Sequence, residues 1–542
     1  MSIKNNTNFK LCILAAGKGT RNTSITGLHK ALLPLENKAV ISRIIDCVSD
    51  DIEIVIAVGY KSEQVKSYIK YIFPTRNIKF VNIDNFSGVG SGPGLSLLMC
   101  KNHLQTPFIF TSTDTIIEES YIFDSLDENW MGVSHVELED SSKYCLVYDH
   151  EDKKGERYLK KMYFGEGNLA YVGAAGIYDY SSFWSSLESK KFDKKDSRNR
   201  DVENEYQVLH GFDGLKKIKL FECSWHDTGN DDSYEKVRKI FSHEVVATKA
   251  NEAVFIENGK VIKYFADADI AKRRIERTKF LNGSSPSIKY LNDNMFSYDY
   301  VNGRLLSNLS EDKLLKKVLP FYFEKFASEQ FEKTDEFLSD CKEMYYNKTH
   351  NRIINSFAGT DLDKIEFING VRVDGILELL KKIDWDSVYD LSVPSRFHGD
   401  FQPENILHDG NDFKLIDWRD SFGKSLEVGD FYYDLGKLYH AIIINGQIVL
   451  SKGYGYKIKN NAVYIEYNLK SNLQLLMNYF ENFCKERELS WSNVELLGIL
   501  QYIGICSLYK EFHGGEYGKF LFLLGKYLLA KKLSEGKNEK IN

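Results

Sequence analysis

The sequence lacks the features that mark secreted, membrane-bound and cysteine-rich proteins. Its apolar runs all stop short of the roughly 18 residues that a membrane-spanning helix needs. The short apolar stretch near the N-terminus does not have the pattern of a signal peptide. The 8 cysteines are scattered and form no C-x-x-C pair, which excludes a disulfide framework and a cysteine zinc site. We therefore expect a cytoplasmic protein with free thiols and no membrane partner.

A strong charge of either sign is also absent. The net charge is only -6 in 542 residues, so nothing attracts the chain as a whole to nucleic acid, although a local basic pocket for phosphates remains compatible with it. The 43% hydrophobic and 27% charged residues are typical of globular proteins. A chain of this length exceeds what one hydrophobic core supports, which predicts about two to four domains.

Strand and helix patterns alternate over residues 1–120, which predicts βαβ units and a mainly parallel sheet. The expected strands are Lys10–Ala15, Glu53–Val58, Ile78–Ile83 and Phe108–Ser112, with helical spacing in Ala39–Val48 and Ser62–Ile72. Residues 121–245 are less regular. We expect strands in Val133–Leu138, Tyr144–Tyr148, Ala174–Tyr178 and Lys217–Cys223, a charged loop in Lys190–Arg200, and a helix in Ser233–Phe241.

A second pattern begins near Glu244. Ala253–Ile256 and Val261–Phe265 flank Asn258-Gly259, which predicts a β-hairpin. Further expectations are a helix in Ala268–Phe280, a strand in Met295–Tyr300, and helices from Glu311 onward, except for short strands near His398–Asp420. The pattern predicts a small β lobe followed by a large helical lobe. The expected domains are residues 1–245 and 246–542.

The segment after the first predicted strand is rich in small residues. It reads L-A-A-G-K-G-T-R from Leu14 to Arg21, and Lys30 follows in H-K-A-L-L-P-L. Small residues let backbone N–H groups approach phosphate oxygens closely, and Lys18 and Arg21 add positive charge there. This pattern favours a loop that binds a nucleotide triphosphate.

These two strings resemble the nucleotidyltransferase family that includes sugar-1-phosphate nucleotidyltransferases, MobA-like enzymes and phosphocholine cytidylyltransferases. The resemblance implies an α/β Rossmann-like domain with a mixed, mostly parallel sheet. It also implies transfer of NMP from an NTP to a phosphomonoester, with Lys30 and Arg21 as catalytic residues. The residues implied to bind the NTP are Leu14, Ala15, Ala16, Gly17, Gly19, Thr20, Arg21 and Gly92.

Three later segments fit the same resemblance. Gly92 lies in G-S-G-P-G, where relatives have a base-recognition loop; this loop differs from their usual G-T-A, so the base is left open. Asp114 ends an apolar run, and Asp227 lies in W-H-D-T-G. The resemblance implies that both carboxylates bind a metal, and two carboxylates at strand ends suit Mg²⁺. A single Asp after a strand is more often a turn or a helix cap, so the combination is what favours the metal site.

The second half contains H-G-D-F-Q-P-E-N from His398 to Asn405, followed by L-I-D-W from Leu415 to Trp418. This pattern resembles the aminoglycoside phosphotransferase and choline kinase family, which is related to the protein kinases. The resemblance implies an α+β protein-kinase-like domain in which Asp400 meets the acceptor hydroxyl and Asn405 and Asp417 bind Mg²⁺. The implied ATP-binding residues are Lys263, Glu276 as its ion-pair partner, and Tyr298 and Tyr300 in the hinge.

Together the two resemblances imply a bifunctional kinase and nucleotidyltransferase. ATP would phosphorylate a hydroxyl of a small sugar or amino-alcohol. A second NTP (CTP, UTP or GTP) would then give up NMP to that monoester, producing a nucleotide-activated precursor of surface polysaccharide. Both transfers would use Mg²⁺.

Several alternatives stay open. One is a choline kinase joined to a phosphocholine cytidylyltransferase that makes CDP-choline, and another is an active nucleotidyltransferase with a degenerate kinase domain. A non-catalytic nucleotide-binding scaffold and a drug-resistance phosphotransferase complete the set. The sequence does not settle whether the chain forms a homo-oligomer.

Overall fold

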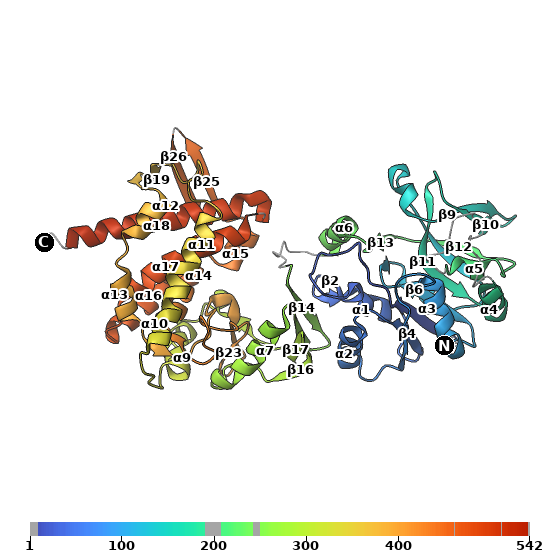
Figure 1. The fold of residues 1–542 in the computed structure, drawn as a ribbon, viewed down its shortest axis with the longest axis horizontal. Coiled ribbons are helices and arrows are strands. Elements are labelled where there is room, and N and C mark those ends of the chain that lie inside the picture. Colours follow the sequence, from blue (N-terminus) through green and yellow to red (C-terminus); the bar gives the residue numbers. More distant parts are fainter. Residues whose placement is uncertain (1–8, 190–206, 242–249, 460, 511, 540–542) are drawn as a thin grey trace. The chain divides into compact units, whose positions relative to one another are not determined.

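The computed structural model describes residues 9–189, 207–241, 250–459, 461–510 and 512–539 (Figure 1). Backbone contacts divide the chain into two compact units, Met1–Ala266 and Asp267–Asn542. The expected boundary between residues 245 and 246 and the expected loop at residues 190–200 lie outside the described residues. The domain limits of the sequence analysis therefore stay a prediction.

A nine-stranded sheet forms the centre of the first unit. Its order is β5 (Ile78–Asn82), β4 (Ile54–Val58), β1 (Lys10–Ala15), β6 (Phe108–Ser112), β11 (Leu169–Ile177), β8 (Trp130–His135), β12 (Lys219–Glu222), β10 (Arg157–Tyr163) and β9 (Leu146–Glu151). The first four strands are parallel, and β12 is parallel to β8. β11 is antiparallel to β6 and to β8, and β10 is antiparallel to β12 and to β9.

The sheet is mixed, as expected, but it is not mostly parallel. Among the described strands the parallel block ends at β6, and antiparallel pairs predominate beyond it. For the pair of β9 and β10 the physical reason is the connection length. Parallel neighbours need a crossover of a dozen or more residues, whereas β9 and β10 are joined by a tight turn that permits only antiparallel pairing.

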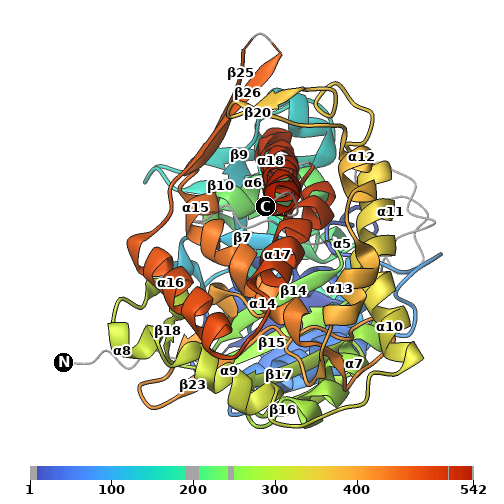
Figure 2. The ribbon, with the colours of Figure 1, turned by 90° about the vertical axis from the view of Figure 1, so that its left-hand side faces the viewer.

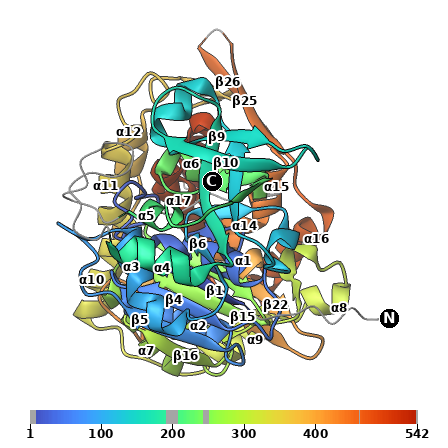
Figure 3. The same cartoon turned by 90° about the vertical axis from the view of Figure 1, so that its right-hand side faces the viewer.

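Helices cover the sheet because their apolar residues repeat at helical spacing. In α2 (Ser62–Ile72) the buried residues include Val65, Tyr68, Ile69 and Ile72, which share one face. On the face that carries Phe108 and Phe110, α4 (Tyr180–Ser189) packs over β6, and α3 (Pro93–Cys100) packs over β1 and β4 (Figure 3). Shorter helices are α1 (Val40–Ile45), α5 (Leu209–Phe212) and α6 (Asp231–Phe241), and small strands are β2 (Pro34–Leu35), β3 (Lys38–Ala39), β7 (Thr115–Ile117) and β13 (Trp225–Asp227).

The predicted hairpin is present as β14 (Glu252–Glu257) and β15 (Lys260–Phe265), and it belongs to the first unit. Its turn residues Asn258 and Gly259 have φ values of 49° and 70°, which Asn and Gly tolerate best. The ring of Phe255 lies 5.0 Å from that of Tyr68. The Glu257 carboxylate accepts hydrogen bonds from the Tyr68 hydroxyl and from the Ala39 N–H, the latter at 3.0 Å.

A fragment that ends at residue 266 should therefore be more stable than one that ends at residue 245. The packing of Phe255 and the buried bonds of Glu257 should raise the melting temperature by about 5–10 °C. Thermal denaturation followed by circular dichroism measures the difference. Phe255→Ala should remove most of the gain, whereas Ile256→Ala, at a side chain that is 40% exposed, should not. Equal melting temperatures of the two fragments would show that the hairpin contributes nothing to this unit.

The second unit is mainly helical. Its helices are α7 (Ala268–Arg277), α8 (Asp312–Leu315), α9 (Val318–Phe326), α10 (Asp335–Lys342), α11 (Lys348–Ile354), α12 (Ile376–Lys381), α13 (Trp385–Leu391), α14 (Phe431–Ile443), α15 (Gly446–Leu450), α16 (Ser471–Glu486), α17 (Trp491–Ile505) and α18 (Glu516–Glu539). α17 packs between α14 and α18 (Figure 2). α14 and α17 approach closely because Gly498 has no side chain: a Cβ there would lie 2.4 Å from Cδ1 of Tyr439.

Short strands complete this unit. They are β16 (Ile288–Asn292), β17 (Met295–Asp299), β18 (Arg304–Leu305), β21 (Pro394–Ser395), β22 (Ile406–His408), β23 (Phe413–Leu415) and β24 (Gly429–Asp430). The strands expected near residues 295–300 and 398–420 are thus confirmed. None of the described helices combines the length and the apolar character that crossing a membrane requires.

One part of the region expected to be helical forms a sheet instead. β25 (Tyr454–Lys459) and β26 (Ala462–Tyr467) pair with β19 (Phe367–Ile368) and β20 (Val371–Arg372) in a four-stranded sheet. Along β26 Val463 and Ile465 are buried and Tyr464 is exposed. This alternation has the period of a strand, so the signal was present in the sequence, although helical patterns on both sides obscured it.

Candidate functional site

The first candidate site begins where β1 ends. Leu14 and Ala15 finish the strand and are buried, and the Ala16 carbonyl accepts a hydrogen bond from the Tyr60 N–H at 3.0 Å. Gly19 has a φ of 61°, and a Cβ at this position would lie 2.8 Å from Cδ of Lys30. Only glycine therefore lets the loop turn and lets the Lys30 side chain pass beside it. The side chains of Lys18, Thr20 and Arg21 are exposed at the outer part of this loop, and no atom would contact a Cβ at Gly17 within 4 Å.

The Lys30 amine forms an ion pair with Asp114. Its Nζ lies 2.9 Å from Oδ2 of Asp114, and the two side chains are 18% and 20% exposed. Burial alone would raise the pKa of Asp114, but the charge of Lys30 and hydrogen bonds from Lys30 and Ser112 outweigh it and lower the pKa to about 2. Asp114 is therefore an anion over the whole physiological pH range, directly beside a cation.

Asp227 lies next to Asp114 because of strand pairing. β13 is antiparallel to β7, with Asp227 opposite Thr115, the residue after Asp114. A Cβ at Gly229 would lie 2.9 Å from Oδ1 of Asp227 and 3.3 Å from Oδ2 of Asp114, so both carboxylates converge on one point. Burial and the charge of Asp114 raise the pKa of Asp227, although a hydrogen bond from the Gly229 N–H opposes this effect.

The residues at this point suit Mg²⁺. Magnesium in phosphate-transfer sites takes one or two carboxylates and completes its shell with phosphate oxygens and waters. Asp114 and Asp227 supply that donor set. In the part of the chain that the structure describes, no three His, Cys, Asp or Glu side chains form a metal-binding group, so a site built wholly from protein ligands has no support there.

Two residues that the sequence analysis missed support this site. The Tyr144 hydroxyl donates to Oδ2 of Asp227 at 3.1 Å. Asp231, at the start of α6, accepts hydrogen bonds from the Thr23 N–H at 2.7 Å and from the Ser24 hydroxyl at 2.6 Å, which ties the loop after Arg21 to the Asp227 segment. Asp231 follows W-H-D-T-G closely and could have been noticed there, whereas Tyr144 has no local signal.

The segment just before the predicted base-recognition loop lies near the glycine loop. A Cβ at Gly59 would lie 2.9 Å from both the Ala16 carbonyl oxygen and Cβ of Phe86, so Gly59 packs between Ala16 and Phe86. Gly92 has a φ of 133° and directly precedes α3, which begins with Pro93. Residues with a side chain rarely adopt this φ, which explains why a glycine occupies position 92.

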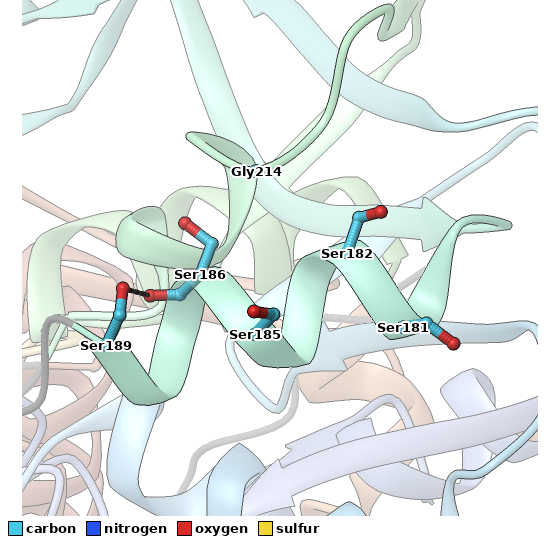
Figure 4. Close-up of a pocket in the computed structure, with 6 residues that line it drawn as sticks. All are labelled: Ser181, Ser182, Ser185, Ser186, Ser189 and Gly214. Atoms are coloured by element: carbon cyan, nitrogen blue, oxygen red, sulfur yellow. Dashed lines mark hydrogen bonds between the residues drawn. The ribbon is translucent and has the colours of Figure 1, made fainter.

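A separate surface hollow of about 460 Å³ lies along α4 (Figure 4). Serine side chains and Gly214 line it, and the Ser189 hydroxyl donates to the Ser186 carbonyl at 2.8 Å. None of the predicted site residues lies in this hollow. We therefore place the candidate site at the glycine loop and not here.

The second candidate site is the loop around Asp400. The Asn405 amide donates to Oδ2 of Asp400 at 3.1 Å and to the Asp400 carbonyl at 2.9 Å. Nζ of Lys437, on α14, lies 3.1 Å from Oδ1 of Asp400. Burial would raise the pKa of Asp400, but the charge of Lys437 outweighs it and lowers the pKa to about 2. Lys437 was not among the residues predicted from the sequence.

Asp417 and Asn405 lie at adjacent strand ends. β22 pairs with β23, and the Ile416 N–H donates to the Asn405 carbonyl at 3.0 Å. Asp417 has a φ of 59°, a strained conformation for a residue other than glycine. The negative charge of Asp417 acts to raise the pKa of the buried His398 and that of Tyr298. A carboxylate and an amide oxygen at these positions have the chemistry of an Mg²⁺ site.

The predicted ATP-binding residues lie in different surroundings. Lys263 is buried on β15 in the first unit, Tyr298 is buried on β17, and Tyr300 is 51% exposed. Glu276 lies half-buried on α7 and forms no side-chain hydrogen bond or ion pair with the residues that the structure describes. Its neighbour Arg277 is fully buried and donates to the carbonyl oxygens of Phe397 and Arg419. Arg277 thus attaches α7 to the His398 loop; it was not among the residues predicted from the sequence.

Asp434, on α14, holds the backbone of the Asp400 loop. Its carboxylate accepts hydrogen bonds from the His398 N–H at 2.6 Å, the Gly399 N–H at 2.7 Å and the Tyr322 hydroxyl at 2.6 Å. Asp430 is the N-cap residue of α14, and its carboxylate accepts a hydrogen bond from the Val393 N–H at 2.9 Å. Both aspartates are fully buried.

Asp434→Ala should destabilise the second unit by about 3–5 kcal/mol, because it leaves two buried N–H groups and a hydroxyl without acceptors. Urea denaturation of the full chain, followed by circular dichroism, measures the loss. Asp386→Ala changes an exposed carboxylate and should alter stability by less than about 0.5 kcal/mol. A similar small effect of Asp434→Ala would contradict the anchoring role of its carboxylate.

No protein-family model matches the chain. Its N-terminal region is similar to curated proteins named Bifunctional protein GlmU. The relative from Methanococcus vannielii is 29% identical over 179 residues, which are 32% of this chain and 40% of the relative. The relative from Methanococcus maripaludis is 26% identical over 270 residues, which are 46% of this chain and 61% of the relative. The chain thus spans about half the length of these relatives.

Among solved structures, an inositol-1-phosphate CTP transferase from T. maritima aligns with a TM-score of 0.34 at 17% identity. The alignment covers 45% of this chain and 100% of that chain. The similarity to GlmU proteins thus lies in the sequence of the N-terminal region, and the sequence matches leave more than half of the chain uncovered.

Proposed function

We propose that the first unit transfers NMP from an NTP to a phosphomonoester and releases pyrophosphate. One observation carries this proposal: Lys30, Asp114 and Asp227 converge beside a glycine loop that follows a buried strand. Charged side chains of both signs at one point are what phosphate transfer needs, because its transition state is stabilised mainly by charge neutralisation and positioning. The sequence similarity to GlmU proteins supports it.

In this proposal a phosphate oxygen of the acceptor attacks the α-phosphorus of the NTP, and the bond to the β-phosphate oxygen breaks. The backbone N–H groups of the loop from Gly17 to Arg21 bind the triphosphate. Lys30 neutralises charge that develops on the transferring phosphate. Asp114 and Asp227 would hold Mg²⁺, which acts as a Lewis acid when it is bound. Tyr144 orients Asp227 through its hydrogen bond.

We further propose that the second unit phosphorylates a hydroxyl group with ATP. Asp400 accepts the hydroxyl proton while the oxygen attacks the γ-phosphorus and ADP leaves. Lys437 stabilises the charge of Asp400, 3.1 Å from its amine, and in this proposal it also neutralises charge on the transferred phosphate. In this proposal Asn405 and Asp417 would hold Mg²⁺. The product is a phosphomonoester, which is the kind of acceptor that the first unit requires, so the two reactions form a sequence.

A nucleotidyltransferase without kinase activity is the second candidate function. The observation in its favour is that the sequence matches cover at most 46% of the chain and lie in the N-terminal region. The intact Asp400, Asn405 and Lys437 arrangement favours two activities.

The experiment uses the full chain with Mg²⁺ and measures the two proposed reactions separately. In one reaction CTP, UTP or GTP is offered with preformed sugar-1-phosphates, inositol-1-phosphate and phosphocholine, and pyrophosphate is measured. In the other, ATP is offered with the corresponding alcohols, and ADP is measured. Pyrophosphate without any acceptor-dependent ADP would select the second candidate. ADP alone would contradict the proposal for the first unit.

A further inference from the structure

A buried histidine directly precedes Lys30. His29 is 1% exposed and lies at the start of the short 3₁₀ turn Lys30–Leu32. Its Nδ1 accepts a hydrogen bond from the Ala31 N–H at 3.1 Å, and its carbonyl accepts one from the Leu32 N–H at 2.8 Å. The side chain and the main chain of His29 thus both hold the turn that carries Lys30.

The imidazole of His29 is neutral. A ring nitrogen that accepts a hydrogen bond carries no proton, so the proton of the ring lies on Nε2. Burial and the charge of Lys30 lower the pKa of His29 to about 3 and outweigh the opposing effect of the Gly17 backbone. At physiological pH the ring therefore keeps Nδ1 as the acceptor for the Ala31 N–H and places no second positive charge beside Lys30.

Two neighbouring segments hold His29 from other sides. Its N–H donates to Oε1 of Gln64 on α2 at 3.1 Å, and Nε2 of Gln64 donates to the Gly27 carbonyl at 3.2 Å. The ring centroid of His29 lies 6.4 Å from that of Tyr60, whose N–H donates to the Ala16 carbonyl in the glycine loop at 3.0 Å. His29 is therefore held both by α2 and by the segment that contacts the glycine loop.

The path of the Lys30 side chain depends on the position of this turn. Lys30 passes Gly19, where a Cβ would lie 2.8 Å from its Cδ, and its amine then lies 2.9 Å from Oδ2 of Asp114. A lysine side chain is long and flexible, so its amine stays at one point only if its backbone and the surroundings of the chain are fixed. The hydrogen bonds of His29 supply the first of these conditions.

We propose that His29 is a positioning residue of the NMP transfer, whose Nδ1 holds the turn in the orientation from which the Lys30 amine reaches Asp114 and the transferring phosphate. This inference rests on the proposed function of the first unit. It requires a hydrogen-bond acceptor at position 29, and neither a charge nor an imidazole as such. Asparagine meets this requirement, because its Oδ1 is as many bonds from Cα as Nδ1 of histidine and because it is a preferred residue at the start of helical turns. Leucine is of similar size and offers no acceptor.

The first test compares His29→Leu with His29→Asn in pyrophosphate release by the full chain. His29→Leu should lower kcat by about ten- to a hundredfold, the effect of moving a catalytic group by about 1 Å, with little change in the KM for the NTP. His29→Asn should keep kcat within about threefold of the wild-type value. His103→Leu, at an exposed histidine of the same unit, should have no effect. Equal losses in the leucine and asparagine variants, or no loss in the leucine variant, would overturn the proposal.

The second test reports the position of the Lys30 amine without turnover. An acylating reagent modifies lysine amines, and mass spectrometry of the peptides gives the rate at Lys30 relative to that at the exposed Lys70. The ion pair with Asp114 should keep acylation of Lys30 slow in the wild type and in His29→Asn. His29→Leu should raise the rate severalfold, because the amine is then no longer held at Asp114. Equal rates in the three proteins would overturn the positioning role.

These two tests also separate the inference from loss of folding and from failure of the proposed function. Circular dichroism during heating shows whether each variant is folded. If His29→Leu does not fold, His29→Ala removes the acceptor without adding a branched side chain, and the same results are expected of it. If the wild type releases no pyrophosphate with any acceptor, the proposed function fails, whereas the acylation rates still decide whether His29 positions Lys30.

Discussion

Replacing Asp114 with Asn should reduce the rate of NMP transfer by about two to three orders of magnitude. The substitution keeps the shape of the side chain but removes a charge from the pair of carboxylates that converge at Gly229. It also removes the anionic partner of Lys30, whose amine lies 2.9 Å away. Pyrophosphate release at saturating NTP and phosphomonoester measures the effect.

Two controls make this result specific. Asp124→Asn changes an exposed carboxylate in the same unit and should leave pyrophosphate release unchanged. ADP formation by the second unit should also be unaffected by Asp114→Asn, because the two reactions use different residues. If the Asp114→Asn protein is folded and releases pyrophosphate within about tenfold of the wild-type rate, Asp114 is not a ligand of an essential metal.

Replacing Asp400 with Asn should reduce acceptor-dependent ADP formation by about two to four orders of magnitude. The amide cannot accept the hydroxyl proton, so the loss should appear in kcat more than in the KM for ATP. Pyrophosphate release from a preformed phosphomonoester should persist. Asp361→Asn, at a fully exposed carboxylate, is the matched control in this unit.

The Asp400→Asn protein needs a check of its stability, because the substitution leaves the buried Lys437 without its carboxylate. The double variant Asp400→Asn with Lys437→Met removes that unpaired charge and should recover stability without recovering ADP formation. Recovery of both would mean that the single variant lost activity through unfolding, and Asp400 would then have no role as a base. Retention of ADP formation by a folded Asp400→Asn protein would lead to the same conclusion.

Motif-based predictions reached the residues that the structure brings together. Lys30 and Asp114 are 84 positions apart, yet their side chains are in contact, and Asp227 joins them through the β7–β13 pair. Asn405 contacts Asp400 within a single loop. Each of these residues lies in a short sequence motif whose glycines and polar residues suit phosphate binding. The motif can therefore be recognised from the local sequence.

Residues that act through packing had no such signal. Lys437 lies in F-Y-Y-D-L-G-K, which reads as an ordinary helix, and its importance depends on where α14 meets the Asp400 loop. On α7, Glu276 and Arg277 are neighbours in a charged run, and successive residues point about 100° apart around a helix. Which of them is buried depends on the surface that the helix contacts, and it is Arg277.

The sequence alone determined the local elements: the buried strand and glycine loop at residues 10–21, the β14–β15 hairpin with its Asn258-Gly259 turn, and the polar loop at Asp400. Each depends on conformational preferences that neighbouring residues set among themselves. The tertiary structure alone decided that the strands after β6 are mainly antiparallel and that Lys437 contacts Asp400. These features depend on contacts between distant segments, whose free energies come from packing and charge and are not written in any single stretch of the chain.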